Sequence, residues 1–181
     1  MRLPLSLVAG FGAALMFLGG CTTAPTTDAG RTDLTTDAQS ALTDFKTVDP
    51  SLDNLLSTST GYAIFPAIGK GAAGVGLAYG QGEVYQQGKR IGYADVSQAN
   101  VGASLGGQSF AELIVFKTPQ ALQSFESAQL TFTVDASAVA AKAGAAANVR
   151  WTNDIAVFAN IKGGLMADLA VGGQKFNYQP Q

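Results

Sequence analysis

The sequence contains no histidine and only one cysteine among its 181 residues. Without histidine the chain lacks the most common general base and the most common metal ligand of proteins, and one cysteine excludes an internal disulfide. The acidic side chains are scattered and form no recognised acid–base motif or metal cluster. A formal net charge of -2 gives no indication of nucleic-acid binding. We therefore expect a protein that is not an enzyme and that needs no metal or cofactor.

The first 20 residues have the layout of a secretory signal peptide. Arg2 supplies a positive start, and the uncharged stretch Leu5–Phe17 is too short to span a bilayer comfortably, which takes roughly 20 residues. The sequence Leu18-Gly19-Gly20-Cys21 that follows resembles the bacterial lipobox. In such signals diacylglycerol alkylates the cysteine thiol, the chain is cut before the cysteine, and the new amine is acylated. The resemblance implies a signal peptide at 1–20 and a lipid anchor on Cys21, the alternative being an ordinary free thiol.

The residues after the cysteine predict where the protein resides and where its folded part begins. By resemblance to lipoprotein sorting in double-membrane bacteria, Thr22 implies the outer membrane facing the periplasm, with the cell surface as an alternative. Residues 21–32 are rich in Thr, Ala, Pro, Asp and Gly without a large apolar side chain. This composition predicts a flexible tether, so that the domain occupies residues 33–181.

The hydrophobic pattern of the domain changes from a helical period to a strand period at Gly61. Apolar residues recur at three- and four-residue steps over 34–48, and a second short helix, with Asp49 as N-cap and Pro50 in its first turn, carries Leu52 and its neighbours inward. Strands are expected at 62–65, 73–79, 84–85, 91–96, 110–116, 130–134, 155–161 and 165–171, with turns at 80–82, 87–88 and 162–164 and a helix at 119–127.

These elements predict an α+β domain. Its centre is a strongly twisted antiparallel sheet, which can curl into a barrel, with short amphipathic helices at the N-terminus and one helix between strands. Glycines at alternate strand positions mark sharp curvature or the close approach of another element. Residues 136–147 are compatible with either helix or extended structure, because their alanines favour helix and Gly144 opposes it.

Four blocks in sequence order resemble the SYLF domain, also called the Ysc84-like domain; they are 61–76, 79–85, 101–116 and 160–165. The resemblance covers about residues 34–178 but fails around 143–149, where an alanine-rich stretch replaces a Gly-Pro-x-Gly-Arg-like segment. In eukaryotic members the family implies binding to phosphoinositide membranes, and in some fungal members binding to actin. What carries over to an exported protein is a lipid-binding module without enzymatic activity.

Four basic residues are candidates for contact with lipid phosphate. Lys70 and Lys162 match lysines in the opening block and the closing turn of the family, while Lys89 and Arg90 are the only adjacent basic pair. The alternative for each is a solvated turn residue. Tyr85, Tyr93 and Trp151 could line a groove, but isolated aromatic residues more often belong to a core or its rim.

The apolar stripe over 34–56 could insert into a bilayer interface, yet Asp37, Asp44 and Asp53 on its outward side favour packing against the sheet. The expected partner is therefore membrane phospholipid, through acylated Cys21 and through the domain. The alternative function is that of a structural or interaction lipoprotein with an envelope protein as its partner.

Overall fold

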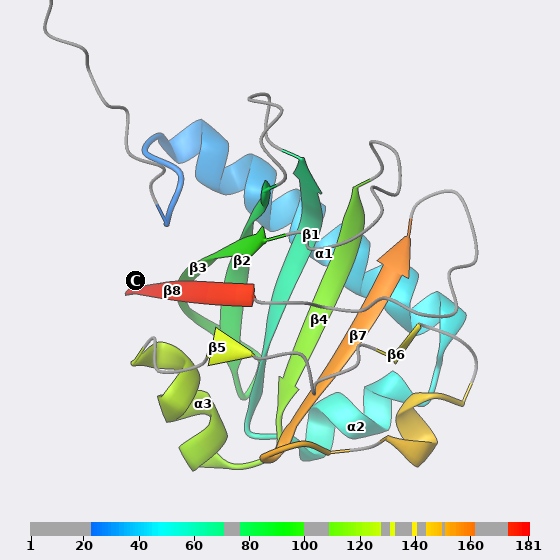
Figure 1. Cartoon of the computed structure of the whole chain (residues 1–181). Helices are drawn as coiled ribbons and strands as arrows, with labels where there is room; N and C mark the ends of the chain where they lie inside the picture. Colours follow the sequence, from blue (N-terminus) through cyan, green and yellow to red (C-terminus); the bar gives the residue numbers. More distant parts are fainter. Residues whose placement is uncertain are drawn as a thin grey trace, which may run out of the picture.

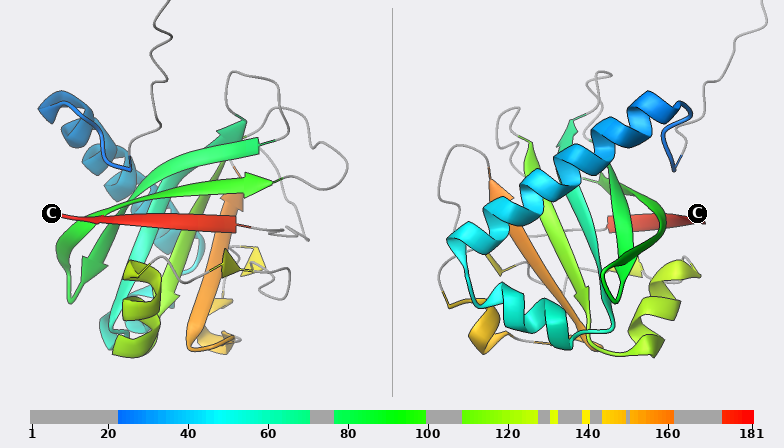
Figure 2. Two further views of the ribbon diagram at one scale, coloured as in Figure 1. Left: turned by 60° about the vertical axis from the view of Figure 1, so that its left-hand side comes forward. Right: turned by 180° about the vertical axis from the view of Figure 1, so that it is seen from behind.

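The computed structural model of the chain describes residues 23–70, 77–99, 109–127, 131–132, 139–140, 144–149, 151–161 and 174–181. Within them one sheet has the strand order β5-β8-β3-β2-β1-β4-β7-β6, and α1 lies diagonally across one of its faces (Figures 1 and 2). The strands are β1 (Gly61–Lys70), β2 (Leu77–Gln86), β3 (Lys89–Ala99), β4 (Phe110–Phe116), β5 (Thr131–Phe132), β6 (Val139–Ala140), β7 (Ile155–Ile161) and β8 (Gln174–Pro180). We call the face that α1 covers the outer face and the opposite one the inner face.

The predicted α+β class with a twisted antiparallel sheet is confirmed. Every neighbouring pair of strands is antiparallel except the short parallel contact of β6 with β7. The sheet curls so strongly that β8 runs across the view while β1 and β4 run up it (Figure 1). In the described residues its two edges, β5 and β6, do not pair with each other. The sheet is therefore not closed into a barrel.

Two strands run through positions where the sequence predicted a stop or a turn. β1 does not stop at Pro66, because the registers with β2 and β4 shift there and the resulting bulge accommodates the proline. β2 continues through Gly80 and Gly82, where a turn was predicted. A Cβ on Gly82 would lie 2.5 Å from the carbonyl oxygen of Ile64. This glycine thus permits a close approach of β1, and the prediction of a turn was wrong.

The middle of the chain follows the predicted pattern more closely. The turn at Gln87-Gly88 is present, with positive φ angles of 49° and 76°, and β4 is buried from Ala111 to Phe116. Helix α3 (Pro119–Glu126) begins with Pro119 in its first turn and Thr118 as N-cap.

β8 was not predicted. The predicted turn at 162–164 and strand at 165–171 lie outside the described residues. Of residues 136–147 the structure describes 139–140 and 144–147, which hold β6 and the start of a 3₁₀ turn at Ala146–Asn148.

Helix α1 (Asp28–Val48) begins earlier and is longer than expected. The side chain of Thr27 caps it by accepting a hydrogen bond from the amide of Gly30 at 3.1 Å. The helix therefore starts inside segment 21–32, for which the composition predicted a flexible tether. The prediction placed this boundary too late because Thr and Asp are typical both of loops and of helix starts.

Helix α2 (Leu52–Thr58) has Ser51, not Asp49, at its N-cap position. The buried carboxylate of Asp49 accepts hydrogen bonds from Ser51 and from the amides of Gly144 and Ala146, at 3.1 and 2.7 Å for the two amides. Burial acts to raise the pKa of Asp49, but these hydrogen bonds outweigh it and hold the pKa below its usual value. Asp49 thus joins the bend between α1 and α2 to Gly144 and Ala146, which lie 95 and 97 positions further along the chain.

Two hydrophobic clusters lie on opposite faces of the sheet. On the outer face Ala38, Ala41 and Phe45 of α1 pack on β1, β4 and β7, which confirms that the stripe of this helix packs against the sheet. On the inner face the aromatic rings of Phe65, Phe116, Phe125 and Phe176 form a contiguous set. None of the helices in the described ranges is both long and apolar enough to cross a bilayer.

Candidate functional site

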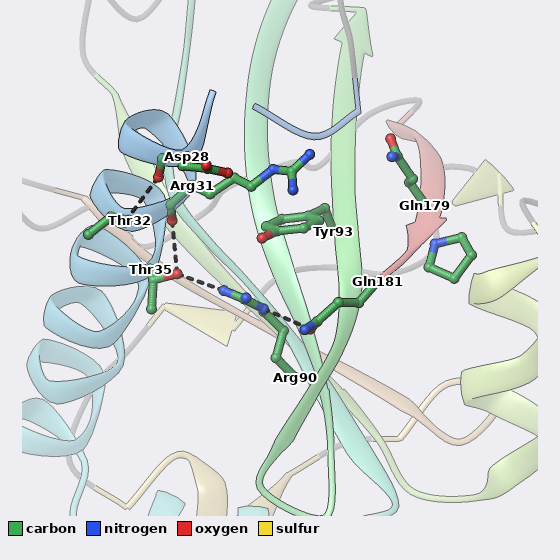
Figure 3. Close-up of a pocket in the computed structure, with 9 residues that line it drawn as sticks. Asp28, Arg31, Thr32, Thr35, Arg90, Tyr93, Gln179 and Gln181 are labelled. Atoms are coloured by element: carbon green, nitrogen blue, oxygen red, sulfur yellow. Dashed lines mark hydrogen bonds between the residues drawn. The ribbon is translucent and has the colours of Figure 1, made fainter. Parts of the chain in front are cut away.

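A polar cleft lies on the outer face, between the first turns of α1, the start of β3 and the C-terminal residues (Figure 3). Its volume is about 420 Å³, which is within the range of small-molecule sites. It is lined by Asp28, Arg31, Thr32, Thr35, Arg90, Tyr93, Gln179, Pro180 and Gln181. We call this feature the α1–β3 cleft.

Arg90 is fixed at the base of the cleft by a buried carboxylate. Its Nη1 atom lies 2.6 Å from Oε1 of Glu83, a side chain that is fully buried. The hydroxyl of Thr35 lies 2.6 Å from the same oxygen, and the hydroxyl of Tyr85 donates to the other carboxylate oxygen at 2.6 Å. Burial acts to lower the pKa of Arg90, but the hydrogen bond and charge of Glu83 outweigh it and raise the pKa. Truncation of Arg90 would leave the buried side chain of Glu83 without its basic partner.

The ring of Tyr93 lies between two guanidinium groups in the close-up of Figure 3. The central guanidinium carbons of Arg31 and Arg90 are 5.8 and 5.0 Å from the ring centroid, within the range of cation–π contacts. The Tyr93 side chain is 4% exposed and packs with Ala24 and Leu34. This small cluster holds Ala24 and the first turns of α1 against β3.

Several donors of the cleft have no protein partner. Arg31 donates through Nε to the carbonyl oxygen of Pro25 at 3.1 Å. Among the described residues neither of its Nη atoms makes a hydrogen bond. The same holds for Nη2 of Arg90 and for the hydroxyl of Tyr93. Although the Tyr93 residue is 96% buried, its hydroxyl oxygen remains accessible to solvent.

A second polar group is buried on the inner face. Glu112 of β4, Gln174 of β8 and Gln98 of β3 are each at most 5% exposed, and the Gln174 amide donates to Glu112 Oε2 at 2.9 Å. One oxygen of each of the three side chains has no partner within the part of the chain that the structure describes. Burial raises the pKa of Glu112 to about 7, although the hydrogen bond from Gln174 acts in the opposite direction. In the described ranges no group of three acidic or cysteine side chains could hold a metal.

The structure brings one of the predicted binding residues, Arg90, into the α1–β3 cleft. Lys89 is exposed beside the turn and does not line the cleft. Lys70 ends β1, while Lys162 and Cys21 lie outside the described residues. Tyr93 lines the cleft, which agrees with the interpretation that it lines a groove, and it also belongs to a small buried cluster, which agrees with the alternative. Arg31 was not predicted, because an isolated arginine within the predicted tether belongs to no recognisable pattern.

The fold and the cleft together define an α+β domain with a curled sheet and a polar surface site. Residues 97–180 match the Ysc84 family, described as Las17-binding protein actin regulator. The match extends from β3 to the end of β8 and confirms the resemblance to the SYLF domain. Over residues 97–180 the chain is thus similar to the Ysc84-type (SYLF) domain. No curated protein matches the chain.

Proposed function

We propose that the protein is a membrane-anchored bacterial lipoprotein whose SYLF domain contacts phospholipid and catalyses no reaction. The observation that carries this proposal is the place of the α1–β3 cleft relative to Cys21. Asp28, on the rim of the cleft, lies seven positions after Cys21. An extended chain spans at most about 3.6 Å per residue, so acylation of Cys21 would hold this rim within about 25 Å of the lipid anchor. A binding site so close to the anchor would meet lipid headgroups before other ligands.

The family supports a binding domain of this kind. Its description names an actin regulator that binds another protein, and the resemblance adds lipid binding to that. An exported domain meets no actin, so lipid is the ligand class that fits both the family and the lipobox-like sequence. We propose the outer membrane, on its periplasmic side, as the location.

The anchor is tested with Cys21→Ser. We expect the variant to lack the acyl chains that mass spectrometry finds on the wild-type protein. A second form, in which a cleavable signal without a lipobox replaces residues 1–21, should be recovered in the soluble fraction. If this second form still fractionates with membranes at high salt, Cys21 is not the anchor.

Contact between the domain and lipid is tested with the same soluble form. It contains every described residue, including both hydrophobic clusters, and its folding is checked by circular dichroism. We expect it to float with phospholipid vesicles. If no vesicle composition recruits it, while cross-linking in intact cells recovers one protein partner, the domain is an interaction module of the envelope instead.

A further inference from the structure

We propose that the α1–β3 cleft binds a phosphodiester headgroup that also carries an ammonium group, as phosphoethanolamine does. This inference rests on the proposed function and names the ligand of the domain. Three properties of the cleft support it: its free hydrogen-bond donors, its charge balance and its place on the molecule.

The free groups of the cleft are mostly donors. Both Nη atoms of Arg31, Nη2 of Arg90 and the hydroxyl of Tyr93 lack partners among the described residues, and all of them can donate a hydrogen bond. A ligand that satisfies such a set must be rich in acceptor oxygens. Guanidinium groups match the oxygens of a phosphate in geometry and charge, because two parallel N–H bonds can reach one phosphate. The donors therefore indicate a phosphate group.

The charge balance of the cleft limits which phosphate it can hold. Among the side chains of the cleft, Arg31 and Arg90 contribute two positive charges, while Asp28 on the rim and Glu83 beneath Arg90 contribute two negative ones. A ligand with a net negative charge would leave this balance uneven. A zwitterionic headgroup keeps it, with the phosphate near the arginines and the ammonium near the carboxylate of Asp28.

The cleft is also positioned for a ligand that belongs to a membrane. Its lining comes from the first two turns of α1, the beginning of β3 and the end of the chain (Figure 3). The side chain of Arg31 is exposed, so a headgroup would reach it without a change in the fold. The aromatic ring of Tyr93 supplies an apolar floor between the two arginines.

The experiment measures binding to the soluble form by calorimetry. The probes are glycerophosphoethanolamine, glycerophosphoglycerol, which has the phosphodiester without the ammonium, and inorganic phosphate. We expect glycerophosphoethanolamine to bind most tightly. Arg31→Gln should weaken this binding about 10- to 100-fold, since a charge-assisted hydrogen bond contributes about 1.5–3 kcal/mol. Asp28→Asn should remove the preference for glycerophosphoethanolamine over glycerophosphoglycerol.

Lys89→Gln is the matched control. It removes the same charge from a residue adjacent to Arg90 but outside the cleft, and it should change the affinity less than about twofold. If Lys89→Gln and Arg31→Gln weaken binding equally, attraction is diffuse and the cleft is not the site. If inorganic phosphate binds as tightly as the headgroup, the ligand is free phosphate and the inference is also wrong.

Flotation with vesicles containing phosphatidylethanolamine separates failure of the inference from failure of the proposed function. If the vesicles recruit the domain and Arg31→Gln lowers this recruitment, the result supports both the inference and the proposed function. Recruitment that Arg31→Gln leaves unchanged overturns the cleft as the site and retains phospholipid contact. If the soluble headgroup binds but vesicles of every composition fail to recruit the domain, the chemistry of the cleft stands and membrane contact by the domain does not.

Discussion

Replacement of Glu112 by glutamine should remove most of the pH dependence of folding stability between pH 5 and 8. Glu112 is fully buried, and burial raises its pKa from 4.5 to about 7. Because this pKa is higher in the folded than in the unfolded protein, folding favours the protonated form. The stabilisation is complete below about pH 4.5 and is lost as the pH rises through 7. Each pKa unit corresponds to about 1.4 kcal/mol, so full ionisation costs about 3 kcal/mol.

The assay is urea unfolding of the soluble form at pH 5 and pH 8, followed by the fluorescence of Trp151, the one tryptophan in the chain. The wild type should lose about 2–3 kcal/mol between these pH values, or roughly 5–10 °C in Tm. Glu112→Gln keeps an amide that can pair with Gln174 and should lose much less. The chain has no histidine, so no imidazole adds to the signal. If wild type and variant differ equally at both pH values, the pKa of Glu112 is the same in the folded and the unfolded protein and the reasoning is refuted.

Two further substitutions test the packing of the strands and of the bend between the helices. Gly82→Ala should lower the free energy of unfolding by about 1–3 kcal/mol, because its Cβ would lie 2.5 Å from the carbonyl oxygen of Ile64; an unchanged urea midpoint would contradict this close approach. Asp49→Ala should cost about 3 kcal/mol, since the amides of Gly144 and Ala146 lose their acceptor. The pKa of Asp49 is lowered in the folded protein, so its contribution should be present above about pH 3.8 and fade as the pH falls further. Equal losses for Asp49→Ala in urea unfolding at pH 2 and pH 6 would show that the carboxylate charge is not responsible.

Elements whose residues carry a clear local pattern were predictable. The stripe of α1, the continuous apolar run of β4 and the capped start of α3 each depend on neighbours within a few positions, and the structure has all three. The tight turn at Gln87-Gly88 belongs to the same group, since its backbone needs positive φ angles that glycine adopts readily.

Glycine was the main source of error. Gly80 and Gly82 were interpreted as a turn, but they allow β1 to approach β2 where a side chain would collide. A turn and a close approach both require the absence of a Cβ, and the sequence does not distinguish them. β8 was missed for a different reason. Its residues, 174–180, are mostly polar, and only Phe176 and Gln174 are buried.

The candidate site could be predicted only in part. Arg90 stands out as half of the one adjacent basic pair, yet its direction, its ion pair with Glu83 and its contact with Tyr93 depend on how β2 and β3 twist. Arg31 gave no sign of its role, because its partners in the cleft are about 60 or more positions away in the chain. Nothing in a one-dimensional pattern links such distant positions.

The sequence by itself determined the type of domain, the stripe that binds α1 to the sheet, the buried central strand and the lipobox-like motif at Cys21. Each of these features depends on residues within a few positions of one another, so it can be recognised without knowledge of the fold. Only the tertiary structure decided that the sheet stays open, that the first helix starts at Asp28, and that Arg31, Arg90 and Tyr93 share one cleft. The reason is physical. The curvature of the sheet and the crossing of α1 over β3 arise from packing between segments that are distant in the sequence. This packing brings the hydrogen-bond donors of Arg31, Arg90 and Tyr93 together in one cleft.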